Sequence, residues 1–534
     1  MSNLERELPD TNTDRKLEPD NNLDISKTFQ ETLGLHVNIF SHNCKRRFRS
    51  KCSPYLLGTT SILFFVLGLL QIVFPPYDIL MNLRLRMIPG LPPYEWWLIP
   101  PDYGIIKIYL FNVTNAERFL NKTDKKIKLQ EIGPIIYREN LIHKNIIFNE
   151  NGTLTYTSNR TLEYLPERNP VNLLNKTVVM PNIAVLFIPS YLYDAPFFIR
   201  FGVNLMMRKL KSLLFKTGTI HDFLWNMSDP ILETSQQIAP SLVRTKNVGF
   251  LKRIYDKYED TTTVYIGPKY DERYFYRIDK YDGSEYMPYL TNCKEKVQGS
   301  IDDVMYFQGI TKNDTLRFFK KTLCRVANLN YAREFERYGL KGYRFEMDQH
   351  FYNRTYPIEN DCYRGKPILP NGLIDVSACN FDSSVAASYP HFLYAEEHLQ
   401  NSVEGLSPDV HKHSAYVEVE PKTGIPLRGA ARSQVNIVIK DMRGFNEKLH
   451  IFSNLTIPLI WIELAQESLS LKVQWLIYIQ VMLMPIFQNI LMISTFLASF
   501  LLFFVYLNRR RKTLWKQSEI KGVFAFEAEK FLKK

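Results

Sequence analysis

The chain has 534 residues, which at about 150 residues per domain is enough for several domains. Hydrophobic residues make up 45% and charged residues 23%, and this balance excludes a collagen-like, low-complexity or wholly disordered chain. A formal net charge of +12 would favour nucleic-acid binding in a soluble protein. Much of that charge flanks two strongly apolar segments near the ends of the chain, so no nucleic-acid partner is expected.

The first apolar segment, residues 55 to 76, contains no charged residue and supplies the roughly 20 positions that a membrane-spanning helix requires. A cleaved signal peptide is the alternative, but its apolar core would be shorter and would lie closer to the start of the chain. We therefore expect residues 55 to 76 to be a retained transmembrane helix, preceded by a cytoplasmic N-terminal tail over residues 1 to 54.

The second apolar segment has no charge between Lys472 and Arg509, which is too long for one perpendicular helix of roughly 20 residues. Pro485 divides it, so we place the second transmembrane helix at residues 486 to 507, followed by a cytoplasmic tail over residues 508 to 534. The part before Pro485 is expected either to continue the helix with a kink or to pack under the domain between the spans.

Basic residues indicate the orientation of the two spans, because Lys and Arg accumulate on the cytoplasmic side of short juxtamembrane segments. Basic clusters precede the first span and follow the second, so both termini are expected in the cytoplasm and residues 77 to 485 outside it. Nine Asn-x-Ser/Thr sequons in that outer domain support this topology, since chance would give about three or four. The predicted glycosylation sites are Asn112, Asn121, Asn151, Asn159, Asn175, Asn226, Asn313, Asn353 and Asn454.

Cysteine usage agrees with an oxidising environment for the outer domain. Four of the six cysteines lie there, and their clustering favours two disulfide bridges in one subregion, with three connectivities possible. These four are Cys293, Cys324, Cys362 and Cys379. No close Cys-x-x-Cys pair indicates a metal site, and no cofactor is expected. Cys44 and Cys52 lie among basic residues beside the first span, where palmitoylation is predicted and free thiols are the alternative.

Alternating apolar positions predict strands in the outer domain at Gly104–Phe111, Ala415–Glu420 and Gln434–Lys440. Pro421 and Gly424 supply a turn between the last two. Short strands separated by Gly, Pro and Asn favour an antiparallel barrel-like or sandwich core, interrupted by helices. The expected fold class is therefore an α+β membrane protein, with a large antiparallel ectodomain anchored by two transmembrane helices.

The clearest helix of the outer domain is predicted at Phe201–Lys216, with one apolar face and one basic face. Several apolar side chains are expected to project from the basic side, and such a surface suits an amphiphilic anion or a protein partner. An ordinary solvated helix face is the alternative. The residues predicted to bind a ligand are Arg208, Lys209, Lys211, Phe201, Leu205 and Phe215.

The sequence contains no motif that indicates catalysis: no zinc-protease helix, nucleophile elbow, phosphate-binding loop or dinucleotide-binding glycine pattern. We therefore do not expect an enzyme. An ecto-nucleotidase and a two-span channel share the predicted topology and are the alternatives from other classes. Neither predicted span carries an ionisable residue that would line a pore.

Several motifs between the two spans, taken in order, resemble the class B scavenger receptor family. They include YLFNVTNAERFL (Tyr109–Leu120), FLWNMSDP (Phe223–Pro230), GLIDVSAC (Gly372–Cys379) and SYPHFLYA (Ser388–Ala395). That family comprises two-span lipid and lipoprotein receptors, with lysosomal integral membrane and sensory-neuron membrane relatives. The resemblance covers nearly everything from the first span to the second.

The resemblance implies an antiparallel β-barrel-like core capped by an apical helical bundle, with an apolar tunnel running through the domain toward the bilayer. It places the predicted helix at the apex, where Lys209 and Lys211 align with family lysines implicated in binding fatty acids and modified lipoproteins. It also suggests the pairs Cys293–Cys362 and Cys324–Cys379. The partners implied are fatty acids, sterols, carotenoids, phospholipids or lipoproteins, together with the lipid bilayer.

We therefore predict a receptor of the plasma membrane, with an endolysosomal membrane as the alternative, that captures lipid or lipoprotein at its apex. Apolar cargo would pass through the tunnel into the membrane, because a continuous dry path avoids exposing each methylene to water at about 0.8 kcal/mol. The alternative function is a receptor for a protein ligand, in phagocytic recognition or as a lysosomal enzyme carrier, without lipid transfer.

Overall fold

The computed structural model describes residues 54–531, apart from 103, 241–242, 244, 256–259, 268, 289, 291–292, 303–304 and 380–384. It divides into two compact units. One is the domain Pro75–Gln488, and the other holds the terminal segments up to Phe74 and from Asn489. Cys44 and Cys52 lie outside the described residues, so their predicted palmitoylation stays a prediction.

The terminal unit contains α2 (Pro54–Val73) and most of α15 (Met484–Phe531). Both helices are long and apolar enough to cross a membrane. The Oγ of Ser61 donates to the carbonyl of Ser499 at 2.9 Å, and the Oγ of Ser499 donates to the carbonyl of Ser61 at 2.9 Å. Gly68 lies against Phe496, where a Cβ would come within 2.8 Å of the ring. Such hydrogen bonds and small-residue contacts are what joins helices in lipid. The two predicted apolar helices are therefore confirmed, while their exact membrane boundaries stay predictions.

The helix that precedes the second span belongs to the domain. It consists of α14 (Leu471–Tyr478) and the π-helix η8 (Ile479–Leu483), which leads directly into α15. Val473, Ile477 and Val481 on one face are buried against Leu340 and Leu427 of the domain. The segment therefore continues the helix and packs under the domain, while the expected kink stays a prediction.

The domain is built on a 13-stranded sheet whose strand pairs are antiparallel. In the order of pairing, the main path is β10 (Leu316–Lys320), β11 (Arg325–Arg337), β12 (Leu340–Met347), β15 (Tyr416–Glu420), β16 (Ile425–Val438), β17 (Thr456–Gln466), β1 (Gly104–Val113), β2 (Leu129–Phe148), β3 (Thr153–Tyr164), β8 (Thr261–Tyr265) and β9 (Ile278–Tyr281). Two short strands, β13 (Ile374–Asp375) and β14 (Val385–Ser388), extend the sheet beside β16.

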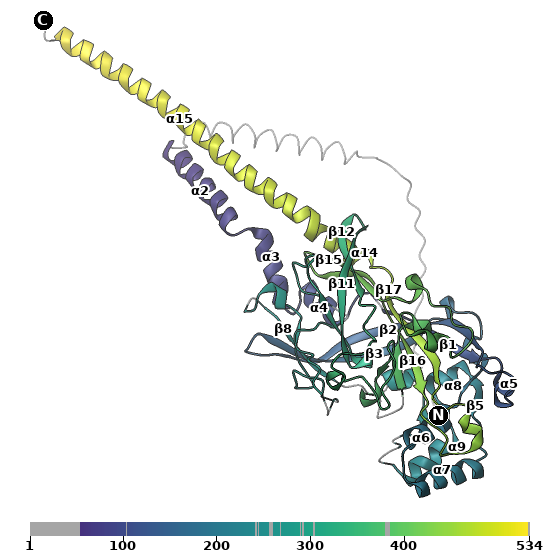
Figure 1. Ribbon diagram of the computed structural model, residues 1–534. Helices are drawn as coiled ribbons and strands as arrows, with labels where there is room; N and C mark the ends of the chain where they lie inside the picture. The colour runs from purple at the N-terminus through teal and green to yellow at the C-terminus, as the bar shows by residue number, and fades with distance from the viewer. Residues whose placement is uncertain are drawn as a thin grey trace, which may run out of the picture. The chain divides into compact units, whose positions relative to one another are not determined.

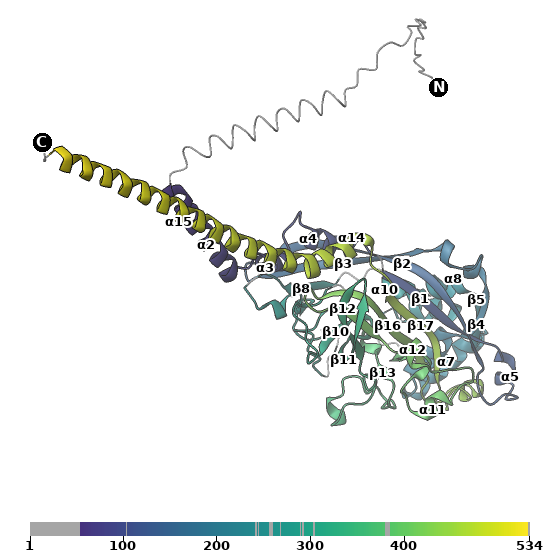
Figure 2. The same cartoon turned by 90° about the horizontal axis from the view of Figure 1, so that it is seen from above.

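The centre of the sheet contains β1 and β17, two strands rich in β-branched and aromatic residues. Ile108 of β1 lies opposite Ile462 of β17 on one side and Ile135 of β2 on the other. Figure 2 shows β1, β16 and β17 crossing the middle of the domain. All three strands predicted from alternation are present, although the last begins at Ile425, directly after the turn. Gly424 in that turn has a φ of +69°, a conformation that favours glycine.

The two ends of the strand path are joined by a short extended segment, Gly299–Ile301. On one side Ile278 of β9 donates its N–H to Ser300 at 2.8 Å and accepts from Gly299 at 2.8 Å. On the other side Ile301 donates to the carbonyl of Arg317 in β10 at 2.7 Å and accepts from Phe319 at 2.8 Å. The segment therefore fills the gap between β9 and β10. This closure confirms the barrel-like core, in which the strand pairs are antiparallel and the closing bridge between Ile301 and Phe318 is parallel.

Helices gather at one end of the domain (Figure 1). They are α6 (Ile183–Tyr191), α7 (Phe197–Lys209), α8 (Ile220–Trp225), α9 (Pro230–Ile238) and α10 (Phe250–Tyr255). Two short β-pairs accompany them, β4 (Thr177–Pro181) with β5 (Phe215–Thr219) and β6 (Met227–Ser228) with β7 (Asn247–Val248). Thr219 begins α8 with a capping box formed with Asp222. We call this end of the domain the apex.

Two further helices lie at the end of the domain away from the apex, α3 (Pro76–Leu85) and α4 (Pro92–Leu98). The N–H of Tyr77 at the start of α3 donates to Oε1 of Gln488 at 2.8 Å, so the domain's first and last residues meet there. The remaining short helices are α5 (Ala116–Leu120), α11 (Glu397–Gln400), α12 (Val410–His413) and α13 (Glu447–His450).

Two disulfides fasten the part of the domain that contains β10 to β14. Cys293 pairs with Cys362, and Cys324 pairs with Cys379, with Cα atoms 5.6 and 6.2 Å apart. Both pairs agree with those implied by the family resemblance.

Candidate functional site

Helix α7 is the apical helix predicted from the sequence, but its boundaries differ from the prediction. It begins at Phe197, directly after Pro196, and ends at Lys209. Lys211 has a φ of +50°, and the N–H of Ser212 bonds back to the carbonyl of Met207 at 3.1 Å, so the chain leaves the helix here. The prediction that the helix continues to Lys216 is therefore wrong. Lys211 takes a left-handed conformation although it is not a glycine, and the helix ends about two turns before Lys216.

The prediction that Phe215 projects from the exposed basic face of the helix is also wrong. Phe215 begins β5 and is buried, with its ring 6.3 Å from that of Phe119 and 5.6 Å from that of Phe452. A helix through Lys216 would have placed it outward, whereas strand pairing with β4 turns it into the core. It cannot take part in a surface site in this conformation.

The other five predicted residues are brought together at the surface by α7 and the turn after it. Phe201 and Leu205 are more than half exposed, and the basic side chains of Arg208, Lys209 and Lys211 are exposed beside them. Three exposed apolar residues at the start of the helix and one after it enlarge this set, and the sequence pattern did not predict them. The apical surface, as we define it, comprises Phe197, Phe198, Ile199, Phe201, Leu205, Leu213, Arg208, Lys209 and Lys211.

The opposite face of α7 holds the helix on the domain. Met207 is buried, and Val203, Met206 and Leu210 pack against the main hydrophobic core. The N–H of Asn446 also donates to Oδ1 of Asn204 at 2.9 Å. The exposed apolar residues therefore sit on a helix that is fixed from behind, as a docking surface requires.

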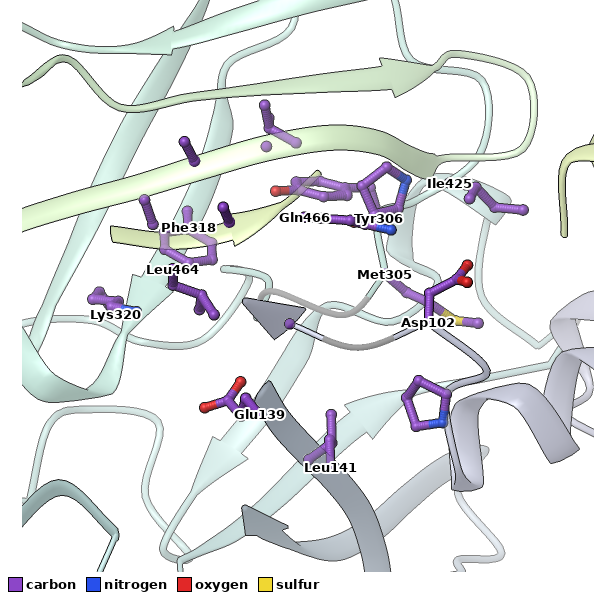
Figure 3. Close-up of a pocket in the computed structure, with 18 of the residues that line it drawn as sticks. Asp102, Glu139, Leu141, Met305, Tyr306, Phe318, Lys320, Ile425, Leu464 and Gln466 are labelled. Atoms are coloured by element: carbon purple, nitrogen blue, oxygen red, sulfur yellow. The ribbon is translucent and has the colours of Figure 1, made fainter. Parts of the chain in front are cut away.

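A second feature is a partly open cavity of about 590 Å³ in the barrel, within the range of sites that hold small molecules. Its wall is drawn from nine strands of the barrel and from α3, α4, α14 and η8. Figure 3 shows Leu141 and Glu139 of β2 facing Leu464, Phe318 and Tyr306 across it. Most wall side chains are apolar, and none of the described residues that line the cavity belongs to α6–α9. The cavity therefore lies in the barrel and toward α3, away from the apical surface.

Several charged side chains of the cavity wall are hydrogen-bonded within the protein. Arg160 donates to Oε2 of Glu139 at 2.8 Å, and Arg432 donates to Oε2 of Glu463 at 2.6 Å. Asp102 accepts the N–H of Ser470 at 2.7 Å. A buried charge is costly unless it is paired and hydrogen-bonded, so these contacts keep the wall compatible with an apolar interior.

Arg84 is the most deeply buried cation of the wall. Its Nη1 donates to the carbonyl of Thr423 at 2.7 Å. Burial lowers the pKa of Arg84 to about 10, while the nearby carboxylate of Glu420 acts in the opposite direction. The guanidinium therefore stays protonated at neutral pH. Burial alone would raise the pKa of Glu463, but Arg432 and Lys107 hold it below its ordinary value.

The predicted glycosylation sites differ in exposure. Asn112, Asn159 and Asn353 are half-buried, and Oδ1 of Asn112 accepts the N–H of Val179 at 2.8 Å. The others are exposed, and they are Asn121, Asn151, Asn175, Asn226, Asn313 and Asn454. Glycosylation of all nine asparagines stays a prediction, and we expect it to be more complete at the six exposed positions than at the three half-buried ones.

These features define a class: a membrane protein with two apolar terminal helices, a barrel-like outer domain, a basic and aromatic apical surface and an apolar internal cavity. The model of the CD36 family matches residues 58–509 of the chain. The chain therefore belongs to the CD36 family.

Individual relatives agree with this assignment. The chain is 27% identical to scavenger receptor class B member 1 of Bos taurus over 439 residues, covering 80% of this chain and 84% of that protein. The Mus musculus protein of the same name is 28% identical with the same coverage. Lysosome membrane protein 2 of Homo sapiens is 26% identical over 409 residues, covering 74% of this chain and 83% of the relative.

Proposed function

We propose that this protein is a receptor that binds lipid or lipoprotein surfaces through its apical surface and carries apolar cargo in its cavity to the membrane. The plasma membrane is the proposed site of action, and an endolysosomal membrane is the alternative. One observation carries the proposal: the barrel-like domain holds a largely apolar, partly open cavity of about 590 Å³.

The cavity supports a carrier function because its wall would shield apolar cargo from water. Each methylene group moved out of water contributes about 0.8 kcal/mol, so an acyl chain or ring system gains several kcal/mol inside. Trp96 of α4 and Leu476 of α14 line the cavity, and these two helices belong to the end of the domain where the chain enters and leaves. Release of cargo at this end would place it beside the bilayer.

The apical surface supports capture of a lipid surface. Phe198 is 83% exposed and Leu213 is 70% exposed, which is costly for large apolar side chains unless a partner covers them. The neighbouring cations would attract anionic head groups at roughly 1 kcal/mol per residue close to the surface. Apolar side chains flanked by Lys and Arg are typical of surfaces that insert at a lipid interface. The proposal includes a step in which cargo passes from the apex to the cavity.

Lipid transfer by the full-length protein tests the proposal directly. The protein is reconstituted into acceptor vesicles, and donor particles carry a fluorescent phospholipid and a fluorescent sterol. Vesicles with protein should gain fluorescence several times faster than empty vesicles. Equal rates for protein-containing and empty vesicles would contradict the proposal.

A receptor for a protein ligand is the second candidate function. The aromatic cluster of the apical surface favours it, since Phe197 stacks on Phe201 with ring centres 6.0 Å apart and such exposed aromatic groups often anchor protein partners. The similarity to lysosome membrane protein 2 is compatible with an endolysosomal role. If this candidate is correct, neutralising Lys209 and Lys211 abolishes partner binding and leaves lipid uptake intact.

A further inference from the structure

Two buried histidines lie in contact beside the central strands of the sheet. The rings of His391, in the short helix η7 (Pro390–Phe392), and of His413, the last residue of α12, stack with their centres 4.4 Å apart. The two residues are 5% and 4% exposed. Phe111 meets the ring of His391 edge-on at 5.3 Å, and Trp461 meets that of His413 at 5.5 Å. Because imidazole takes up a proton near neutral pH, such a pair can respond to mild acid.

The hydrogen bonds of His391 define which of its ring nitrogens carries the proton. Nε2 lies 2.7 Å from Oε2 of Glu131, and Nε1 of Trp461 donates to the same oxygen at 2.7 Å. Burial alone would raise the pKa of Glu131, but these hydrogen bonds hold it below its ordinary value, so the group is a carboxylate. A carboxylate only accepts, so Nε2 of His391 donates. Nδ1 of the neutral ring is then an acceptor, and the N–H of Ser407 donates to it at 3.1 Å.

His413 accepts in the same way from the same stretch of chain. The N–H of Asp409 donates to Nδ1 of His413 at 3.0 Å, so the proton of the neutral ring is on Nε2. A second proton on the Nδ1 of either histidine would face a backbone N–H, and that hydrogen bond would be lost. Burial, aided by His391, lowers the pKa of His413 to about 4. The folded structure therefore keeps this ring neutral, and a proton can enter only at the expense of the contact.

The two hydrogen bonds hold a segment that has few apolar contacts. We call this segment, Ser407–Ser414, the strap. It contains one large apolar residue, Val410, which is 46% exposed. Its helix α12 has four residues and begins after the capping residue Asp409. At the end of the strap, Arg432 donates to the carbonyl of Ser414 at 2.5 Å. Segments with little buried apolar surface open at low cost, so loss of the two histidine acceptors should free the strap.

The strap leads directly into the wall of the cavity. Ala415 and Tyr416, the next two residues, line the cavity, and β15 begins at the second of them. Arg432, which holds the end of the strap, also lines the cavity and donates to Oε2 of Glu463 at 2.6 Å. Opening of the strap would therefore remove the support of the wall where β15 starts.

The acidic groups around the two rings stay ionised in mild acid. Hydrogen bonds from the N–H groups of Lys412 and His411 hold the pKa of Asp409 below its ordinary value. The pKa values of Glu131 and Glu463 are held below theirs, as described above. The titratable and charged groups on the elements packed around the rings are Lys107 of β1, Glu131 of β2, Asp409, His411 and Lys412 at α12, Arg432 of β16 and Glu463 of β17. The carboxylates therefore do not supply a response between pH about 7.4 and 5.

We propose that the stacked histidines are an acid-sensitive latch, which releases the strap and loosens the adjoining cavity wall when the pH falls. The latch itself does not depend on cargo, whereas its effect on the cavity rests on the proposed function. In the open strap, His413 takes up a proton at the ordinary pKa of about 6.5. The closed strap is therefore fully favoured above that pH and loses stability as the pH falls toward 4. Lowering the pH from about 7.4 to 5 should raise the opening equilibrium roughly 30-fold.

Hydrogen–deuterium exchange measures this opening in the full-length protein in nanodiscs. Peptides are analysed by mass spectrometry at pH about 7.4 and 5, with labelling times scaled for the intrinsic pH dependence of amide exchange. Protection of peptides covering Ser407–Ser414 should fall roughly 30-fold in acid. Peptides from α8 at the apex should keep their protection. Equal protection of the strap at both pH values would overturn the latch, and an equal fall in α8 would show general unfolding and overturn it as well.

The variant His413→Asn keeps an acceptor and removes its titration. Asparagine carries an amide oxygen on the carbon that bears Nδ1 in histidine, so it accepts the N–H of Asp409 at any pH. The strap should stay protected at neutral pH and lose most of its acid response. His411→Asn, which changes an exposed histidine of the same helix, is the matched control and should respond like the wild type. A full acid response in His413→Asn would overturn the role of His413. The wild-type exchange decides the question even where this variant does not fold.

Release of a fluorescent sterol tests the effect on the cavity, because this probe has no titratable group of its own. Protein loaded with the sterol is mixed with excess empty vesicles. Release should be several times faster at pH about 5 than at 7.4 in the wild type, and nearly independent of pH in His413→Asn. A strap that opens without any change in release would overturn the link to the cavity. If the wild type retains no sterol at neutral pH, the proposed function fails together with that link, and the exchange data alone decide the latch.

Discussion

The apical surface and the cavity use the same kinds of residues in opposite ways. At the apex, Arg208, Lys209 and Lys211 are exposed and stand beside exposed phenylalanines. In the cavity, cations such as Arg160 and Arg432 are bonded to carboxylates and the apolar residues face inward. The apex is thus arranged to attract an external charged surface, and the cavity to hold something without charge. The difference predicts that the two regions can be disabled separately.

Filling the cavity should have the largest effect. Ala431 of β16 lines it, and Ala431→Trp would occupy much of the space that cargo requires. We expect lipid transfer by the reconstituted protein to fall more than tenfold, while binding of anionic vesicles to the apex is unchanged. Ala431→Ser, which keeps a small side chain at the same position, serves as the control and should transfer lipid like the wild type. Normal transfer by the tryptophan variant would contradict the assignment of cargo to the cavity.

Reversing charge at the apex should have the converse effect. Lys209→Glu with Lys211→Glu should weaken binding of vesicles containing anionic phospholipid more than tenfold at low salt, since each basic residue near a membrane is worth roughly 1 kcal/mol. The matched control reverses Lys269 and Lys280, exposed lysines in and beside the β8 and β9 hairpin at the other end of the domain. A flotation assay measures both. Equal loss in the control would show that net charge, and not the apical surface, attracts the vesicles.

Removing a disulfide should affect the barrel and spare the apex. Cys324→Ser with Cys379→Ser opens a loop of 55 residues, which should lower the free energy of unfolding by about 2–4 kcal/mol. The expected readout is a lower unfolding temperature and faster loss of bound lipid, with vesicle binding at the apex retained. Cys44→Ser with Cys52→Ser is the control, because these cysteines are outside the outer domain predicted from the sequence. An unchanged unfolding temperature would contradict the assigned role of the disulfide.

The smallest predicted effect concerns acid stability at a buried histidine pair. His413 stacks on His391 with ring centres 4.4 Å apart, and Nε2 of His391 lies 2.7 Å from Oε2 of Glu131. Burial, aided by His391, lowers the pKa of His413 to about 4. Between pH about 6.5 and 4 the unfolded chain binds a proton that the folded chain does not, so stability falls as the pH is lowered through this window.

The expected loss across that window is about 1–3 kcal/mol. Thermal unfolding of the full-length protein in nanodiscs at a series of pH values measures it. His413→Gln should flatten the pH dependence, since glutamine does not titrate. A variant with the same acid sensitivity as the wild type would show that another group is responsible.

The apex was largely predictable from sequence because its residues lie on one helix. The 3.6-residue helical period puts Phe201, Leu205 and Arg208 on one side of that helix, and all three are exposed there. Its end could not be predicted, because Lys211 takes a left-handed conformation that no glycine signals. The exposed Phe197 and Phe198 were missed because the predicted helix began only at Phe201. Pro196, directly before them, is a recognisable start signal for a helix.

The cavity could not be predicted residue by residue because its wall is assembled from strands far apart in the chain. Leu141 of β2 faces Leu464 of β17, and the polar positions Tyr352 and Gln480 carry no local pattern that marks them. Alternation in the sequence was enough to predict strands and an antiparallel core. The closure through Gly299–Ile301 depends on long-range pairing, and only the three-dimensional structure reveals it.

Photo-crosslinking tests most directly whether the cavity holds lipid. A lipid with a diazirine near the end of its acyl chain is bound to the full-length protein in nanodiscs, and the labelled peptides are identified by mass spectrometry. The account predicts labels on wall residues such as Leu141, Met305 and Leu464, with their loss in Ala431→Trp. Labels confined to α2, α15 and the apical surface, with none on the cavity wall, would contradict it.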